Sequence, residues 1–541
     1  MGESFALMGI VFAAAAGFGT MARLLRQPPL LGYIAAGILL SGTGLLAGFN
    51  QAEMLGQLGV TLLLFLAGLE LPIADLKRIG RTALVTGLGQ IIVTSVLGFG
   101  IAKVLGFANL PAIYLGIGLT FGSTILVVKL LSEKGDLQSL YGKIAMGYLL
   151  VQDFVAIGLL VVLAGVARDG DFNFGGVIIL MIKGAVMVGL AMFLSGTVMN
   201  KIMGFFAKST ELLFVAATAW CLGIAAIVAS PMFGFSVEIG GFLAGLALSG
   251  VAEQAQIIAR VKPLRDFFLT WFFVALGAGM HFANMGNIFL PAVVLSVYVL
   301  IGNPLIVMII LGLLGYRKRT LFMASLAVAQ VSEFSLIIVT RAVGTGMLNQ
   351  QILTLLTCVC LITMSVSTYM IWYADKIYRK ISRFLGIFES KKTKEKTWSG
   401  DKLEAHVILF GHNRIGNVIR PVLQKMGKKI VVVDFNPSVI DSLDTSGILA
   451  IYGDMGDSEL YERLNLSDAE AVISTVPDIN DSLHLLSEVK ACGKKIVVVV
   501  TAVDEMEEKR LYAAGASFVL VPHNVGGQYL AQELERHTLG I

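Results

Sequence analysis

The sequence predicts a two-part protein: an all-α polytopic membrane domain over residues 1–376 and an α/β domain over residues 403–541, joined by a linker over residues 377–402. Composition is the first reason, because hydrophobic residues make up 56% of the 541 residues and charged residues only 14%, whereas soluble domains have about a quarter of their residues charged. The second is a change of pattern near residue 373, where long apolar stretches give way to basic and polar sequence.

Apolar length predicts the layout of the membrane part. A helix needs about 20 apolar residues to cross a bilayer, and with Gly, Pro and charge clusters as boundaries we expect about thirteen such spans. They centre near residues 13, 36, 63, 91, 119, 156, 188, 219, 244, 273, 297, 331 and 362. The stretch 5–20 lacks a basic leader and is followed by two arginines, so we interpret it as the first span rather than as a signal peptide.

Basic residues predict the orientation. Alternate loops hold about fifteen Lys and Arg residues, against about three in the others, and positive charge marks the cytoplasmic side. We therefore expect the amino terminus outside and the tail in the cytoplasm. The formal net charge of +4 mostly reflects this bias and indicates no nucleic-acid partner.

The pair Gln152–Asp153 lies inside the apolar run 144–164. An ionised carboxylate at bilayer depth costs several kcal/mol unless a cation, a proton or water meets it, so it is a functional-site candidate that indicates ion transport. The alternative is a structural Asp153 paired with a cation such as Lys183 on the neighbouring span.

Two spans carry polar residues where the bilayer is deepest. The fifth contains Ser123 and Thr124 after several glycines, and the twelfth contains Ser332 and Glu333. Irregular backbone at this depth needs protein or a water-filled cavity to satisfy its polar groups, as in the broken helices of transporters with inverted repeats. If spans one to six repeat as spans eight to thirteen, the fifth corresponds to the twelfth, and we expect two inverted six-helix repeats.

These motifs resemble those of the monovalent cation:proton antiporters of the second class, and most closely the Kef-type potassium/proton antiporters. The resemblance covers nearly the whole chain. It implies crossed, unwound helices, a homodimer in the inner (plasma) membrane, and an elevator movement of a core against a dimerisation domain. It also implies that Asp153 carries cation and proton in turn, with Gln152 beside it and with Ser123, Thr124, Ser332 and Glu333 at the crossover.

The physical chemistry of exchange agrees with this implication. One carboxylate cannot hold a proton and a partly dehydrated cation together, so loading one expels the other. Because Gln152 rather than a second acid precedes Asp153, and because Asn303 stands where some relatives carry a Lys or Arg, we expect electroneutral exchange. Asn303 before Pro304 is equally consistent with a helix kink. Glu333 is either a second titrating acid or a structural partner of a basic residue, and we favour the structural role.

The tail begins with a strand, the motif G-H-N-R-I-G at 411–416 and a second strand ending at Asp434. A strand, a glycine turn at a helix amino terminus and an acid about 20 residues on form the Rossmann-like dinucleotide arrangement. Asn413 replaces its middle glycine and adds bulk where a pyrophosphate would approach, which favours a mononucleotide or no nucleotide.

This tail is similar to the regulatory potassium-conductance (RCK) domain, also called the TrkA amino-terminal domain. The resemblance implies an adenine nucleotide, AMP or NAD(H), as regulator; the alternative is an empty dimerisation scaffold. Its nucleotide positions would be Gly411, Asn413, Arg414, Ile415, Gly416, Asp434, Gly453, Asp454 and Thr475. No room remains for a substrate domain, so we expect no enzyme. Kef relatives are closed by glutathione through an acidic loop, but the corresponding loop 253–265 is basic here, so we do not expect glutathione gating or the matching ancillary subunit.

The predicted function is exchange of a monovalent cation, K⁺ by resemblance, for H⁺. One alternative is a Na⁺/H⁺ antiporter of the same fold. Another is a ligand-gated potassium channel, although the sequence has no Thr-Val-Gly-Tyr-Gly filter. A third is a sensor that has lost transport.

Overall fold

The described residues of the membrane part form helices and the turns between them in the computed structural model. The structure describes residues 2–43, 51–70, 80–134, 136, 139–169, 183–184, 186–193, 195–230, 233, 235–280, 285–389, 404–412, 414–434, 437–453, 455–456, 460–461 and 464–536. Backbone contacts divide the chain into two compact units, the first comprising residues 1–130, 144–310 and 322–380 and the second comprising residues 131–143, 311–321 and 381–541. Among the described residues, seven helices are long and apolar enough to cross a bilayer, and several shorter apolar helices accompany them.

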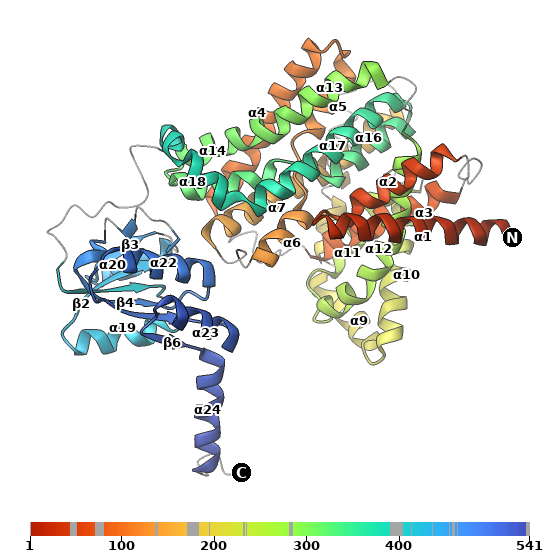
Figure 1. Cartoon of the computed structure of the whole chain (residues 1–541). Helices are drawn as coiled ribbons and strands as arrows, with labels where there is room; N and C mark the ends of the chain where they lie inside the picture. Colours follow the sequence, from red (N-terminus) through yellow and green to blue (C-terminus); the bar gives the residue numbers. More distant parts are fainter. Residues whose placement is uncertain are drawn as a thin grey trace. The chain divides into compact units, whose positions relative to one another are not determined.

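The helical elements follow one another without a strand through the described part of residues 2–388, as Figure 1 shows. They are α1 (Gly2–Leu24), α2 (Pro29–Gly42), α3 (Gln51–Leu69), α4 (Arg81–Val104), α5 (Asn109–Gly118), α6 (Thr124–Lys134), α7 (Leu140–Asp169), η2 (Ser195–Met199), α9 (Asn200–Phe206), α10 (Thr210–Val228), α11 (Val237–Leu248), α12 (Gln254–Ala278), α13 (Met285–Val297), η4 (Tyr298–Gly302), α14 (Asn303–Leu313), α15 (Lys318–Ser325), η5 (Leu326–Val328), α16 (Glu333–Gly344), α17 (Gln350–Trp372), α18 (Ala374–Leu385) and η6 (Gly386–Phe388).

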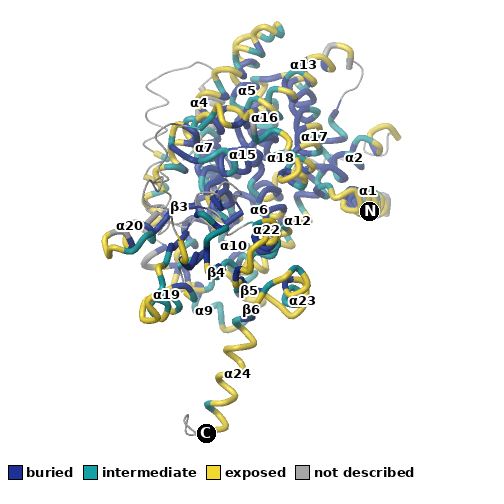
Figure 2. The backbone as a smooth tube through the Cα atoms, turned by 60° about the vertical axis from the view of Figure 1, so that its left-hand side comes forward, coloured by how far each residue is buried: buried dark blue, intermediate teal, exposed yellow. Residues whose placement is uncertain are grey.

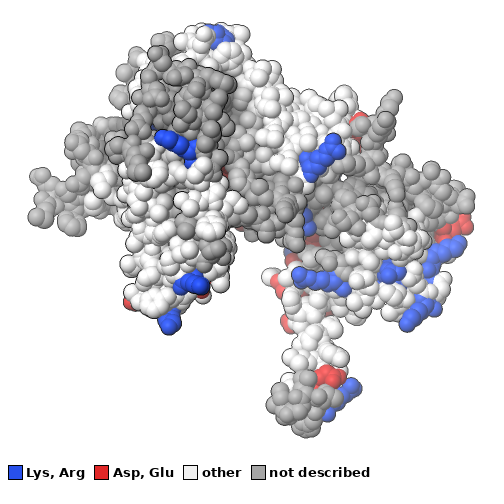
Figure 3. All heavy atoms as spheres, turned by 180° about the vertical axis from the view of Figure 1, so that it is seen from behind, with Lys and Arg blue, Asp and Glu red and all other residues white. Residues whose placement is uncertain are grey.

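The first unit contains two groups of helices. In one, α12 packs on α2 and α3, α11 packs on α3 and α10, and α1 packs on α2. In the other, α5 packs on α4 and α16, and α17 packs on α13 and α16. Among the described side chains on the face seen in Figure 3, few over the helical unit are charged. Figure 2 shows exposed residues along α4, and Ile92 and Val96 on this helix are more than 60% exposed. Such apolar exposed faces suit contact with lipid.

Glycines let α3 and α11 approach closely. A side-chain carbon at Gly245 would clash with the Phe65 carbonyl oxygen, and one at Gly68 would clash with that of Phe242. Lipid tails are as apolar as the helix surfaces, so the hydrophobic effect does not drive helices together inside the bilayer. Close van der Waals packing does so instead, and small residues at the interface let the two backbones approach. The α3–α11 contact therefore depends on having no side chain at these two positions.

The second unit contains a fully parallel sheet. Its strand order is β3-β2-β1-β4-β5-β6, with helices in the connections. The elements are β1 (His406–Phe410), α19 (Gly416–Lys425), β2 (Lys429–Asp434), α20 (Pro437–Thr445), β3 (Ala450–Tyr452), η7 (Leu466–Asp468), β4 (Ala469–Ser474), α22 (Ile479–Ala491), β5 (Val497–Thr501), α23 (Glu505–Ala514), β6 (Phe518–Leu520) and α24 (Pro522–Glu535). The predicted fold class, an all-α membrane part followed by a Rossmann-like α/β domain, is confirmed. The count of thirteen spans and the boundaries at 376 and 402 stay predictions.

The sheet's core is apolar on both faces, as expected for parallel strands covered by helices. Ile408, Phe410, Val431, Val433 and Val498 are at most 2% exposed. The chain order reverses at β1, whose two neighbours are β2 and β4. This switch point is where an open parallel sheet leaves a crevice at the carboxyl ends of its strands.

We predict that Gly245→Ala destabilises the helical unit, because the new methyl group forces α3 and α11 apart. Overpacking of this kind costs about 1–3 kcal/mol, measured as a lower apparent melting temperature of the detergent-purified protein. The matched control is Gly158→Ala on α7, where no atom lies within 4 Å of the new carbon, so helix propensity should leave stability unchanged or slightly raised. Equal melting temperatures for the two variants would contradict the close-packing explanation.

Candidate functional site

Two helix breaks cross inside the first unit. The first separates α5 from α6 and the second separates η5 from α16. Their backbones bond directly, since the Ser332 N–H donates to the Phe121 carbonyl at 2.8 Å. At Gly122 a side-chain carbon would lie 3.0 Å from the Leu149 side chain and 3.1 Å from the Ala327 carbonyl, so glycine permits the crossing. The predicted crossed, broken helices are therefore present.

Asp153 lies on α7 beside the first break. Its carboxylate is half-buried, and its Oδ2 atom accepts a hydrogen bond from the Thr124 hydroxyl at 2.9 Å. Thr124 is the first residue of α6, so the carboxylate bonds to a residue at the positive end of a half-helix. Unpaired N–H groups at such an end favour a negative charge.

Ser332 and Glu333 lie at the start of α16. The Ser332 hydroxyl accepts from the Phe334 N–H at 3.1 Å and bonds with the Glu333 carboxylate at 3.3 Å. Glu333 is 4% exposed and interacts electrostatically with Asp153 and with the buried Arg265 of α12. Arg265 itself forms an ion pair with Asp266 at 2.7 Å, and the choice between a titrating and a structural role for Glu333 stays a prediction.

Ser123 is buried, and its hydroxyl accepts from the Leu126 N–H at 3.3 Å, within the first turn of α6. Gln152 is also buried and faces the first break: its Oε1 accepts from the Gly122 N–H at 2.9 Å and its Nε2 donates to Gln90 at 2.7 Å. The ion-binding roles of the six candidate residues stay predictions; these are Ser123, Thr124, Gln152, Asp153, Ser332 and Glu333. The structure brings all six to the crossing.

Sequence reasoning missed the buried amide Gln90 and did not foresee the contacts of Asn303. Gln90 donates to the Thr120 carbonyl at 3.0 Å, and Asn303 donates to the Leu119 carbonyl at 2.8 Å. The available signal was a glutamine inside the apolar run that forms α4. A buried amide in a membrane helix indicates that it bonds to a partner on another element.

The second candidate site is the glycine turn after β1. Gly411 has φ of +84°, which suits glycine. A side-chain carbon at Gly416 would clash with the Gly411 carbonyl oxygen, so the start of α19 packs tightly on the turn. Thr475 directly follows β4, and its hydroxyl donates to the Gly411 carbonyl at 3.0 Å. These contacts form the strand–turn–helix geometry at the switch point of the sheet.

Asp434 ends β2 beside this turn. Its Oδ2 atom accepts from the His412 N–H at 2.7 Å, and its carbonyl accepts from the Gly453 N–H at 3.2 Å. Arg414 is exposed, and Ile415 directly precedes α19. Asn413 and Asp454 lie outside the described residues. The nucleotide-binding roles inferred from the sequence for nine residues of this domain, Gly411, Asn413, Arg414, Ile415, Gly416, Asp434, Gly453, Asp454 and Thr475, stay predictions.

His412 lies in the same turn. Its Nε2 atom accepts from the Arg420 side chain at 3.0 Å. Burial lowers the pKa of His412, and the Arg420 charge lowers it further, although Asp434 opposes the shift. The neutral ring is therefore the form that the folded domain favours.

Family models match both parts of the chain. The model for the transmembrane sodium/hydrogen exchangers matches residues 10–372, and the model for the TrkA-N domain matches residues 407–522. The chain is 26% identical over 535 residues to YbaL of Escherichia coli (strain K12), a candidate cation/proton antiporter, covering 96% of this chain and 95% of that protein.

Solved structures are similar as well. The sodium proton antiporter MjNhaP1 from Methanocaldococcus jannaschii aligns with a TM-score of 0.53 at 16% identity, covering 71% of this chain and 100% of that one. The TrkA-N domain of E. coli YbaL aligns at 20% identity with a TM-score of 0.24, covering 25% of this chain and 99% of that one. The first of these likenesses shows the fold of the membrane part.

We predict that the α/β domain loses stability as the pH falls below about 6.5, the unfolded-state pKa of histidine. Folding lowers the pKa of His412, so as the pH falls the unfolded chain binds a proton at this residue before the folded domain does. Proton binding then favours the unfolded chain, and the folded domain has its full stability only above about pH 6.5. Calorimetry of the full-length protein between pH 5 and 8 measures this as a falling transition temperature. His412→Gln should make the fall shallower and leave the part due to the buried His406, whose pKa burial also lowers; the exposed-site control His523→Gln should not change the fall. A flat wild-type profile would refute the prediction.

Proposed function

We propose, from the premise that this chain belongs to the transmembrane sodium/hydrogen exchanger family, that it exchanges a monovalent cation for a proton at Asp153. The chain is a cation/proton antiporter with a TrkA-N domain. The observation that carries the proposal is the half-buried Asp153 carboxylate, bonded to Thr124 where α6 begins beside the crossing. The family is one of transporters, and we propose no enzymatic activity.

Exchange follows from competition for one carboxylate. A proton neutralises Asp153, and a dehydrating cation needs the same oxygens in their ionised form, so the two occupants exclude each other. Asn303, on the helix before the second crossing segment, contributes a neutral amide whose contacts are to backbone and to Thr94. With no basic side chain at that position, one cation moving against one proton is the exchange we propose, and it transfers no net charge.

The cation is proposed to be K⁺, on the resemblance of the motifs to the Kef-type antiporters. Na⁺ is the other candidate, because selectivity depends on cavity size and field strength around the dehydrated ion. A potassium channel is a weaker candidate, since a broken-helix crossing around a carboxylate suits alternating access. The proposed location is the inner (plasma) membrane, with the amino terminus outside, the TrkA-N domain in the cytoplasm, and the protein a homodimer.

The proposed regulator is an adenine nucleotide, AMP or NAD(H), in the turn of Gly411. Supporting this, the turn, the start of α19 and Asp434 have the arrangement of dinucleotide sites. Glutathione and an ancillary subunit are not part of the proposal, because the segment 253–265 carries basic residues. The sequence predicted a loop here, but in the structure residues 254–265 belong to α12.

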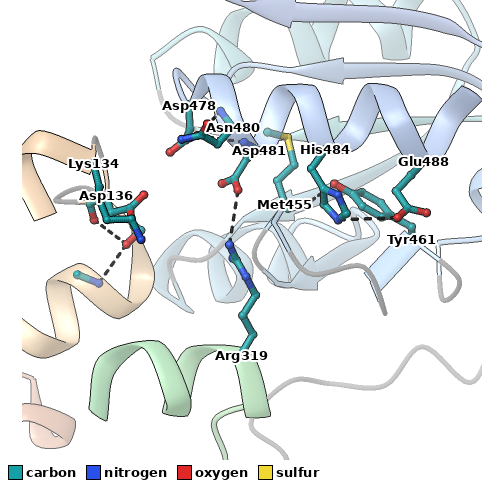
Figure 4. A network of polar contacts seen from close by, with 12 residues as sticks. Lys134, Asp136, Arg319, Met455, Tyr461, Asp478, Asn480, Asp481, His484 and Glu488 are labelled. Atoms are coloured by element: carbon teal, nitrogen blue, oxygen red, sulfur yellow. Dashed lines mark hydrogen bonds and ion pairs between the residues drawn. The ribbon is translucent and has the colours of Figure 1, made fainter. Parts of the chain in front are cut away.

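An ion pair in the second unit offers a route from nucleotide to transport. Asp481 lies in the first turn of α22, soon after Thr475. It pairs with Arg319, as Figure 4 shows; the distance from Oδ1 of Asp481 to Nη2 of Arg319 is 3.7 Å. Both side chains are less than 20% exposed. Arg319 lies on α15, which continues through η5 toward the second break. A nucleotide that shifts the start of α22 would therefore act on the segment leading to Gln330 and Ser332.

Asp153→Asn should abolish exchange, because the amide can take neither a proton nor a cation in the carboxylate's place. The assay adds K⁺ or Na⁺ to everted vesicles and follows internal pH, with expression checked for each variant. The matched control is Asp136→Asn, an acid paired with Lys134 at 3.2 Å outside the crossing. Exchange that survives in Asp153→Asn would refute the proposed function, while current without proton movement would support a channel.

Arg319→Gln or Asp481→Asn should reduce the effect of nucleotide on exchange and leave the exchange rate without nucleotide within about twofold, because the pair lies outside the ion site. Both side chains are mostly buried, and removing one partner of such a pair can cost stability, so the amount of folded protein is measured for each variant. Exchanging the charges, with Arg319→Asp and Asp481→Arg together, should restore part of the response. The control is Lys494→Gln, which breaks the exposed pair with Asp468; equal responses in all variants to added AMP and NADH would argue against this route.

A further inference from the structure

Besides Gln330 of the second break, which donates to the Ser123 carbonyl at 3.3 Å, three buried amide side chains from neighbouring helices bond around the first helix break. They are Gln90 on α4, Gln152 on α7 and Asn303 at the start of α14, and none of the three is exposed at all. They come from three helices far apart in sequence. Amides are expensive to bury at bilayer depth unless their hydrogen bonds are satisfied, so the arrangement needs an explanation beyond packing.

The break leaves backbone groups without helical partners, and the amides bond to them. The Leu119 carbonyl accepts from Asn303 at 2.8 Å, and the Thr120 carbonyl accepts from Gln90 at 3.0 Å. The Gly122 N–H donates to Gln152 at 2.9 Å. An unsatisfied backbone group in a bilayer costs several kcal/mol, so each bond stabilises the broken form of the chain.

The amides are also linked to one another. Gln152 Nε2 donates to Gln90 Oε1 at 2.7 Å, Gln90 Nε2 donates to the Thr94 hydroxyl at 3.1 Å, and that hydroxyl donates to Asn303 Oδ1 at 3.2 Å. Every oxygen of the three amides therefore accepts a bond, and every nitrogen donates at least one. A fully connected buried network of this kind fixes the relative positions of its members.

We propose that Gln90, Gln152 and Asn303 form a neutral positioning cluster that holds the first break, and through it Thr124, in register with Asp153. This rests on the proposed function, in which Asp153 carries the ions. Gln152 and Asp153 are neighbours on α7, so the bond from Gly122 to Gln152 fixes the break relative to the helix that bears the carboxylate. Gln152 then acts by positioning the break rather than by binding the ion.

Amides suit this task better than charged groups. Each amide donates and accepts at once, which the mixed set of carbonyl and N–H groups at the break requires. A Lys or Arg at position 303 could donate to the Leu119 carbonyl but could not accept from Thr94. It would also add a permanent positive charge beside the site where a cation must bind.

The experiment compares Gln90→Leu with Thr86→Val in the full-length protein. Thr86 lies one turn before Gln90 on the same helix, and its hydroxyl is equally buried but has no bonding partner among the described residues. Gln90→Leu should raise the KM for the cation roughly tenfold and shift the pH optimum of exchange, because Thr124 loses its register with Asp153. Thr86→Val should change neither. A structural role alone would lower the amount of active protein without moving the KM or the pH optimum.

A second variant and a second readout keep the test decisive. Asn303→Leu is similar in shape, adds no charge and removes the donor to the Leu119 carbonyl, so it should raise the KM in the same direction if Gln90→Leu fails to fold. Hydrogen exchange of residues 119–124 reports the break without transport and should be faster in both variants than in the wild type or Thr86→Val. Unchanged KM and unchanged hydrogen exchange would overturn the positioning cluster. A wild type with no cation-dependent proton movement would instead overturn the proposed function, and hydrogen exchange would still decide the cluster.

Discussion

The membrane part depends on one constraint: every backbone polar group at bilayer depth needs a partner, and the two crossing helices each contain a break that removes partners. The structure meets this need in two ways. At the amino-terminal ends of α6 and α16, Ser123 and Ser332 accept from backbone N–H groups. At the carboxyl ends of the broken segments, carbonyls accept from buried amides. The neighbouring helices α4, α7 and α14 therefore supply hydrogen-bond partners for the first break, and α7 also carries Asp153.

The sequence predicted what depends on local pattern. The two breaks follow from polar residues and glycines inside apolar runs, and the parallel sheet follows from alternating strands and helices around the motif at 411–416. It did not predict which polar groups meet. The bond between Gln152 and Gln90 joins residues 62 positions apart, and the bond between Thr94 and Asn303 joins residues 209 positions apart. Such pairs are set by helix packing, which no local periodicity encodes.

Local sequence pattern also could not show which groups Gln152 contacts. Its place beside Asp153 in the sequence suggested a shared role at the ion, but adjacent residues on a helix point about 100° apart. Asp153 bonds to Thr124, whereas Gln152 bonds to Gly122 and Gln90. Two neighbours in the chain thus contact different residues of one break, Gly122 and Thr124. The proposed division of tasks, in which Asp153 binds ions and Gln152 positions the break, rests on this difference.

The partial charge of a half-helix explains why a neutral cluster is sufficient. In the proposed cycle Asp153 must lose one occupant before it takes the other, and the ionised carboxylate between them needs stabilising inside the membrane. The amino terminus of α6 supplies roughly half a positive charge, and Thr124 donates a hydrogen bond from the same end. A full positive charge there would hold the carboxylate and exclude the cation. A half-charge lowers the cost of the empty state and still leaves the carboxylate available to a proton or a metal ion.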